Sequence, residues 1–180
     1  MELISRLVVI VQSAVLDPSV GSALAVFVFS LLAEILAVFP SAIILSSPLL
    51  FFSGNLSIVL IAKYFFFVAV PFGLGNVVGS LPVYGLSYFG GKPAINRFQK
   101  YLHFSWKDVE KLEARFKGLW YDELIFLFLR TIPFMFTLPV NIVAGVLRMR
   151  IAPYLVLTLV GMTLKLMVMF FLAGLGIINL

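Results

Sequence analysis

The chain has 180 residues, of which 62% are hydrophobic and 12% are charged, and its mean hydropathy is +1.14. A water-soluble domain is closer to half apolar and about a quarter charged, so the composition excludes an ordinary soluble domain and predicts an integral membrane protein. The length predicts a single membrane domain over residues 1–180. The lack of cysteine and the single histidine, His103, exclude thiolate and histidine-cluster metal sites. We expect no metal and no cofactor.

The net charge of +5 does not indicate nucleic-acid binding, because the charges are concentrated in one mixed block. Seven of the thirteen basic residues lie between 92 and 117, interspersed with acidic residues. Such a block beside apolar segments is typical of a loop or surface helix that touches lipid headgroups. The positive-inside rule places it in the cytoplasm. We therefore expect a multi-pass protein of the plasma or inner membrane.

The first long apolar stretch covers residues 20–53 and is interrupted by Pro40 and Pro48. Roughly 33 helical residues would extend about 50 Å, well beyond a hydrocarbon core of about 30 Å. The two prolines therefore predict a hairpin that enters the membrane and returns to the same side.

Residues 56–90 form the next apolar region. Their length fits either two short crossings or one long tilted crossing, and hairpins inserted from opposite sides require the single crossing. Gly75 and Gly79 have the small-xxx-small spacing that lets two membrane helices approach closely, and plain helix packing is the simplest interpretation.

The pattern of polar and apolar residues over 105–117 predicts an amphipathic, water-exposed helix that Ser105 can cap. Val109, Leu112 and Phe116 recur at helical spacing. We expect this stripe to face the lipid or the bundle while the polar side is solvated.

The pattern of the first stretch recurs in residues 121–147, which are mostly apolar and broken by Pro133 and Pro139. Residues 151–178 follow as a continuous C-terminal transmembrane helix. Two proline-broken stretches, each followed by a more continuous segment, are typical of transporters built from repeats with discontinuous helices. The predicted fold is an all-α membrane bundle with two re-entrant hairpins and a transporter-like inverted repeat.

Ionisable residues inside these apolar segments are the candidate functional groups, because charges at membrane depth are costly and usually functional. Arg130 precedes the Pro133 break, where it can act with half-helix N-termini as an anion receptor. Glu34 can accept and release a proton. Lys165 is expected to form a salt bridge with Glu34, and Lys63 can extend to the interface. The alternative is that Glu34 and Arg130 only pair with each other as a structural clamp.

Two segments resemble the DedA family, also called the VTT or SNARE-associated domain family. In "RTIPFMFTLPVNIVAGVLRM", residues 130–149, the matching positions are Arg130, Pro133, Asn141, Ala144, Gly145 and Met149. In "GNVVGSLPVYGLSYFGG", residues 75–91, they are Gly75, Gly79, Tyr84 and Gly91. Glu34, Pro40 and Ser41 match the start of the family more loosely.

The resemblance implies a membrane lipid translocase or scramblase, not an enzyme, that moves a phosphate-headgroup lipid between leaflets with proton coupling. Polyprenyl phosphates and phospholipids are the lipids implied. The resemblance also implies a substrate-binding set and a coupling carboxylate: Arg130, Pro133, Asn141 and Gly145 for the headgroup and Glu34 for the proton. Lys165 remains the possible charge partner that its place in the apolar segment indicates. The rival hypothesis is a non-transporting assembly or scaffold protein whose buried charges are structural.

Three positions depart from the family pattern. Ala42 stands where many members have a second acid, and Phe136 stands where a second arginine or a proline is common. Ser80 replaces an aspartate that often follows the glycine pair. The missing acid and arginine leave open whether this chain couples lipid movement to protons.

Overall fold

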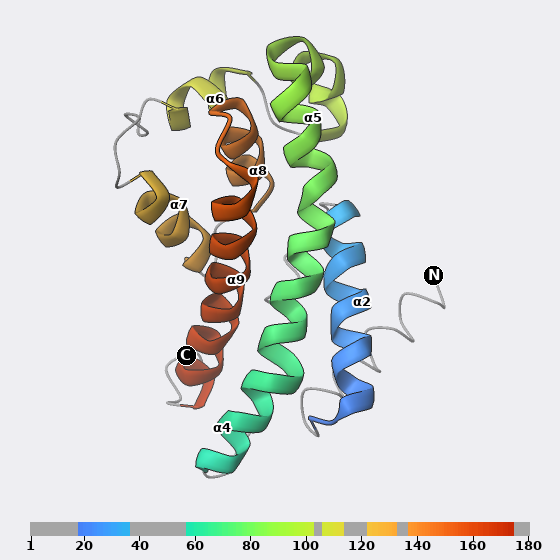
Figure 1. Cartoon of the computed structure of the whole chain (residues 1–180), viewed down its shortest axis with the longest axis vertical. Coiled ribbons are helices and arrows are strands. Elements are labelled where there is room, and N and C mark those ends of the chain that lie inside the picture. The colour runs from blue at the N-terminus through green and yellow to red at the C-terminus, as the bar shows by residue number, and fades with distance from the viewer. Residues whose placement is uncertain (1–17, 37–56, 103–105, 114–121, 133–136, 175–180) are drawn as a thin grey trace.

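The computed structural model describes residues 18–36, 57–102, 106–113, 122–132 and 137–174. All regular structure within these ranges is helical (Figure 1). In chain order the elements are α2 (Val20–Leu36), α4 (Ile58–Tyr64), the π-helix η2 (Phe65–Ala69), α5 (Val70–Leu102), α6 (Trp106–Glu113), α7 (Asp122–Thr131), α8 (Thr137–Val146) and α9 (Ile151–Gly174).

Two helices are long and apolar enough to cross a membrane. The first is Ile58–Pro93, in which α4, η2 and α5 follow one another in a single helical rod, and the second is Ile151–Leu172 within α9. At about 1.5 Å per residue, each exceeds a hydrocarbon core of about 30 Å. Within the described residues, 56–90 thus contributes one long helix and not two short crossings.

Proline and glycine explain the two irregularities of this rod. Pro71 has no N–H, and its ring would clash with the carbonyl four residues earlier in a regular α-helix. The chain widens into the π-turn η2 just before it, where the Val70 N–H donates to the carbonyl of Phe65, five residues back. At the other end the helix kinks at Gly91, whose φ of 50° and ψ of −144° favour a residue without a Cβ.

Helix α5 is the centre of the bundle and packs against α2, α8 and α9. Figure 1 shows α2, α5 and α9 side by side along the length of the molecule. Gly75 and Gly79 meet successive turns of α2, so α2 and α5 run in the same direction. Helix α9 runs in the opposite direction, because its first turn lies against Tyr84 and its last turns against Tyr64.

The predicted close packing of the glycine pair is confirmed. A Cβ on Gly75 would overlap the Oγ of Ser30 and the carbonyl oxygen of Phe27, and a Cβ on Gly79 would lie 2.8 Å from both the Leu31 carbonyl oxygen and the Glu34 Cβ. Only glycine lets the two backbones approach this closely. The pair therefore also fixes where Glu34 lies against α5.

We expect Gly75→Ala to destabilise the bundle by about 1–3 kcal/mol, because an added methyl group has no space and the helices must shift. Gly85→Ala in the same helix is the matched control, since nothing lies within 4 Å of its added Cβ. The control should stabilise by about 0.5–1 kcal/mol, because alanine loses less entropy in a helix. Thermal unfolding of both variants in detergent measures the difference. Equal melting temperatures for the two would contradict the close approach of α2 and α5.

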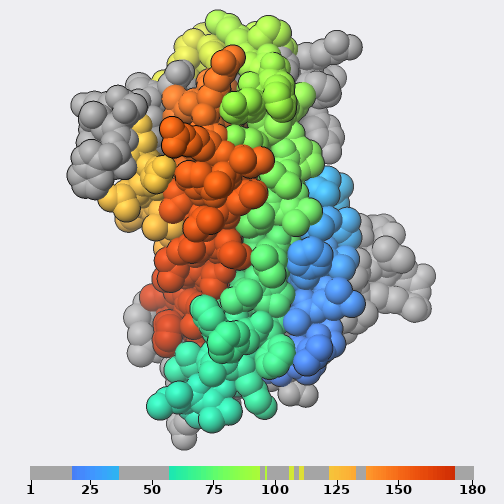
Figure 2. All heavy atoms as spheres, viewed as in Figure 1, coloured from blue at the N-terminus to red at the C-terminus, as the bar shows by residue number. Residues whose placement is uncertain are grey.

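The molecule carries apolar residues on its outside and polar residues within. Large apolar side chains recur every four residues along the exposed face of α2: Val20, Leu24, Val28 and Leu32. A similar outer stripe runs along α9, over a surface that Figure 2 shows in part: Val156, Val160, Leu164 and Val168. The buried set includes charged and amide side chains: Glu34, Asn76, Arg130, Asn141 and Lys165. This is the polarity expected of a bundle whose solvent is lipid and not water.

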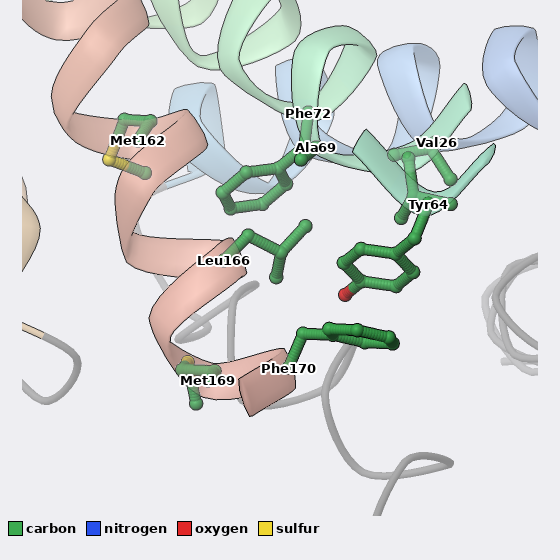
Figure 3. Close-up of a cluster of buried hydrophobic side chains, with 9 residues drawn as sticks. Val26, Tyr64, Ala69, Phe72, Met162, Leu166, Met169 and Phe170 are labelled. Carbon is green, nitrogen blue, oxygen red and sulfur yellow. The ribbon is translucent and has the colours of Figure 1, made fainter. Parts of the chain in front are cut away.

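An apolar cluster closes one end of the bundle. Figure 3 shows Tyr64 and Phe72 from the long rod facing Leu166 and Phe170 of α9. The rings of Tyr64 and Phe170 stack with centroids 4.3 Å apart. Such contacts join the long rod to the second half of α9.

Helix α7 lies beside the first half of α9, and helix α8 packs mainly against α5. The end of α7 meets Gly161, near the middle of α9. Phe126, one turn earlier in α7, lies against Tyr154 in the first turn of α9. Helix α8 begins beside Glu34 and ends against Ser87 further along α5. The two helices therefore run in opposite directions, with their inner ends at the same level.

The helix ends differ in places from those expected from the sequence. Pro139 was expected to break the second hairpin, but it lies in the first turn of α8, where a missing N–H is tolerated. Helix α5 is helical on to Leu102, but it kinks at Gly91, so the straight rod ends close to the expected residue 90. The turn residue Pro133, the Pro40–Pro48 part of the first hairpin and Phe116 of the amphipathic stripe lie outside the described residues.

Candidate functional site

Three helices bring the candidate residues together in the middle of the bundle. Glu34 lies in the last turn of α2, Arg130 in the last turn of α7 and Asn141 in the second turn of α8. Only 7%, 1% and 1% of these side chains, respectively, is exposed. Residues more than a hundred positions apart in the chain thus form one buried polar group.

The Glu34 carboxylate accepts two hydrogen bonds from α8. Thr137 donates its hydroxyl to Oε2 and Asn141 donates its Nδ2 to Oε1, both at 2.8 Å. Because both partners are donors, the arrangement fits an ionised carboxylate, which only accepts. Thr137 is the first residue of α8, so the positive end of this helix also faces the anion.

The Arg130 guanidinium is held from one side by Asn141 and Tyr154. Its Nη2 donates to the Oδ1 of Asn141 and to the Tyr154 hydroxyl at 3.4 Å, and that hydroxyl itself donates to Asn141 Oδ1 at 3.0 Å. The guanidinium carbon lies 5.2 Å from the ring centroid of Phe126 and 5.7 Å from that of Tyr154, which adds cation–π attraction.

Gly161 makes room for the arginine. A Cβ at this position would lie 2.7 Å from the Cβ of Arg130, closer than such atoms approach. The glycine therefore lets α7 approach α9 closely enough for Arg130 to reach Tyr154.

Two of the three guanidinium nitrogens of Arg130 have no hydrogen-bond partner in the part of the chain that the structure describes. Both Nε and Nη1 are buried there without an acceptor. A buried donor without a partner costs about 1–3 kcal/mol, and more when it is charged. Arg130 therefore presents buried, charged donors that an anion could satisfy.

Glu34 and Arg130 are linked indirectly, unlike the direct clamp that was the alternative hypothesis. Among the described residues, Asn141 stands between the two charges, donating to Glu34 and accepting from Arg130. The physical reason is the register of α8, which inserts an uncharged amide where a direct ion pair would otherwise form.

Lys165 is the third buried charge, with 4% of its side chain exposed. It interacts electrostatically with both Glu34 and Arg130. Its ammonium group adds to the positive charge of the site, which holds two cations and one carboxylate in their ionised forms.

Two residues of the predicted binding set lie elsewhere or are not described. A Cβ on Gly145 would lie 2.6 Å from both the Ser87 Cβ and the Tyr84 carbonyl oxygen, so this glycine packs α8 against α5 and does not face the charges. Pro133 lies outside the described residues. Tyr84, another matched residue, donates its hydroxyl to the Met149 carbonyl at 2.5 Å and fastens the turn between α8 and α9 to α5.

Sequence reasoning missed Thr137, Tyr154 and Gly161. A signal for two of them was present, because Tyr154, Thr158, Gly161 and Lys165 recur at spacings of four, three and four and so share one face of α9. Thr137 gave no comparable signal. Among the described residues, no group of three or more histidine, cysteine, aspartate or glutamate side chains could hold a metal ion.

An all-helical bundle with two long apolar helices, a lipid-like exterior and buried charges defines a membrane protein. The family model of the VTT domain matches residues 39–174. The chain therefore belongs to the VTT domain family, as its DedA-like motifs predicted. Neither the curated proteins nor the solved structures contain a significant match to it.

Proposed function

We propose that this protein moves a phosphate-headgroup lipid between the leaflets of the plasma or inner membrane. The observation that carries the proposal is the buried Arg130 guanidinium, whose Nε and Nη1 donors lack partners among the described residues. A charged group at membrane depth is retained at considerable cost. A ligand that pairs with those donors during transfer offsets that cost.

Phosphate is the ligand that this geometry favours. A guanidinium presents donors in a planar fork that matches phosphate oxygens, and it keeps its charge when buried. Asn141 and Tyr154 hold one edge of the fork and leave the buried Nε and Nη1 donors without an acceptor among the described residues. In this proposal the headgroup binds those donors while its hydrocarbon tails stay in the lipid.

Glu34 is the proton-coupling group in the proposed mechanism. It is the only acid found among the buried residues of the described chain, and through Asn141 it is one side chain away from Arg130. A carboxyl at this place can carry a proton into an otherwise apolar layer. Lys165 balances its charge when it is ionised.

We further propose that α7 and α8 form the second re-entrant hairpin, over residues 121–147, and that α2 begins the first hairpin, over residues 20–53, of an inverted repeat. Each of α7 and α8 has 10 residues, which is about 15 Å of helix and half of a hydrocarbon core. The inner end of α7 lies beside Gly161, near the middle of the α9 span, and the inner end of α8 lies beside Glu34. This length and placement support a segment that enters halfway and returns.

Single cysteines test this topology, because the chain has none of its own. We expect Glu123→Cys and Arg150→Cys to react with a membrane-impermeant maleimide from the same side, since the hairpin returns to where it entered. Both residues are exposed. Ser57→Cys, at the start of the long rod, is the control and should react from the opposite side. Reaction of positions 123 and 150 from opposite sides would refute the hairpin.

The rival function is a membrane scaffold whose charges only hold helices together. Under that hypothesis Arg130 should be fully paired, and the unpaired Nε and Nη1 count against it. Reconstitution into liposomes decides between the two. Labelled polyprenyl phosphate and labelled phospholipid are supplied separately, with and without a pH gradient, and leaflet transfer is measured. Transfer of neither lipid above the rate in protein-free liposomes would reject the translocase.

A further inference from the structure

The amide of Asn141 has a fixed orientation in the buried polar group. Its Nδ2 faces the Glu34 carboxylate at 2.8 Å, and its Oδ1 accepts from Arg130 and from the Tyr154 hydroxyl at 3.0 Å. The reverse orientation would point a donor at the guanidinium and an acceptor at the carboxylate. The observed orientation satisfies an ionised Glu34, and a proton placed on Oε1 would oppose it.

We propose that Asn141 is a positioning residue that couples the protonation of Glu34 to anion binding at Arg130, so that a proton and a phosphate lipid bind together. The inference rests on the translocase function proposed above and specifies how its two charges communicate. In this mechanism Glu34 and Arg130 communicate through Asn141 and need no direct contact.

Protonation of Glu34 changes the kind of hydrogen bond that Asn141 must make with it, from donating to accepting. A proton from water attaches to Oε1, and the carboxyl changes from an acceptor to an O–H donor at the atom that Asn141 faces. Rotation of the amide by about 180° turns Oδ1 toward Glu34 to accept this hydrogen. Thr137 can continue to donate to Oε2, where it lies at 2.8 Å.

The same rotation releases Arg130. Nδ2 now faces the Tyr154 hydroxyl, which can accept from it, but Nη2 of Arg130 loses Oδ1 as its acceptor. Nη2 then keeps only the long contact to the Tyr154 hydroxyl, at 3.4 Å, while Nε and Nη1 already lack partners among the described residues. The guanidinium then has more donors to offer an external anion, and the loss of one negative charge at Glu34 favours the anion further.

Coupling of this kind is reciprocal, so an anion bound at Arg130 must favour the protonated form of Glu34. Under this proposal the affinity for a phosphate lipid rises as the pH falls, by up to about tenfold per pH unit. Other titratable groups around Glu34 are Arg130 of α7 and Lys165 and Tyr154 of α9. Helices α5 and α8 present uncharged residues to it, with Gly79 and Thr137 the closest.

The test measures binding of two probes to the purified full-length protein across a range of pH. A short-chain phosphatidylglycerol represents phospholipids and farnesyl phosphate represents polyprenyl phosphates, so the two arms identify the lipid source. Glu34→Gln is measured in parallel to subtract the titration of the probe itself. In the wild-type protein we expect affinity for at least one probe to rise as the pH falls.

Asn141→Leu and Asn141→Ser should bind the probe with an affinity that changes less than about twofold per pH unit, compared with up to about tenfold for the wild type. Leucine has no hydrogen-bonding group, and the serine hydroxyl is too short to span from Glu34 to Arg130. Asn141→Gln keeps both ends of the amide and should restore the pH dependence. Asn76→Leu is the matched control, because this buried amide bonds within its own helix, from Nδ2 to the Phe72 carbonyl at 2.8 Å.

Three results would overturn the relay while leaving the translocase in place. In the first, the affinity of the wild type for the probe is flat or falls at low pH. In the second, a folded Asn141→Leu or Asn141→Ser variant keeps the pH dependence of the wild type. In the third, such a folded variant binds the probe at no pH. The second would show that charge alone couples the sites, and the third would make Asn141 a ligand of the anion. Failure of the wild type to bind either probe at any pH would instead reject the proposed function.

Discussion

Replacing Arg130 by lysine should reduce lipid transfer by about 10- to 100-fold while leaving the protein folded. Lysine keeps the positive charge but replaces a planar fork by a point charge, so at least one charge-assisted hydrogen bond to the phosphate is lost. Such a bond contributes about 1.5–3 kcal/mol, and each 1.36 kcal/mol is a factor of about ten in rate. Transfer of labelled lipid in liposomes, with size-exclusion profiles to show folding, measures the effect.

Arg150→Lys is the matched control for this change, because Arg150 is exposed and lies outside the buried group. It should transfer lipid at the wild-type rate. Arg130→Ala removes the charge altogether and should abolish transfer, and it also takes away the donor to Asn141. If purified Arg130→Lys moved lipid as fast as the wild type, the arginine would be a structural element and the proposed mechanism would be wrong.

Glu34→Gln should remove the dependence of lipid transfer on a pH gradient. Glutamine has nearly the same size and can still accept from Thr137 or Asn141 through its carbonyl oxygen, but it is neutral at every pH. The variant should therefore fold and bind lipid, yet transfer it at the same rate with and without the gradient. Liposomes with an imposed pH difference, compared with equal pH on both sides, provide the measurement.

Glu123→Gln makes the same chemical change at an exposed acid in the first turn of α7. This control should respond to the gradient as the wild type does. If Glu34→Gln kept its full response, the proton would be carried by another group. If the wild type showed no response to the pH gradient at all, the transporter would be uncoupled from protons. The presence of Ala42, where many family members have a second acid, would explain that result.

The sequence alone determined the class of protein and most of its buried charges. Composition excludes a soluble domain because so many apolar side chains cannot all be covered in a chain of this length. Glu34, Arg130 and Lys165 could be identified because a charge inside an apolar segment is visible without any knowledge of tertiary contacts. The small-xxx-small pair at Gly75 and Gly79 predicted close packing for the same local reason, and the motif around Arg130 predicted the family.

Local patterns were less informative about where helices begin and end. Pro139 was expected to break a helix, but the effect of a proline depends on its distance from the first hydrogen-bonded turn, and α8 begins only two residues before it. Pro71 gave no sign of the π-turn that precedes it. Such details depend on how each helix is held by its neighbours.

Only the tertiary structure decided how the charges are connected. The sequence predicted a Glu34–Lys165 ion pair and left a direct Glu34–Arg130 pair as the alternative, since opposite charges in an apolar layer attract. For the second pair, the register of α8 places Asn141 between the carboxylate and the guanidinium, with Thr137 and Tyr154 as further partners. Hydrogen bonds depend on distances of about 3 Å and on direction, and the sequence fixes neither between residues that lie more than a hundred positions apart. For that physical reason the sequence predicts which charges are buried, while only the tertiary structure determines which atoms they contact.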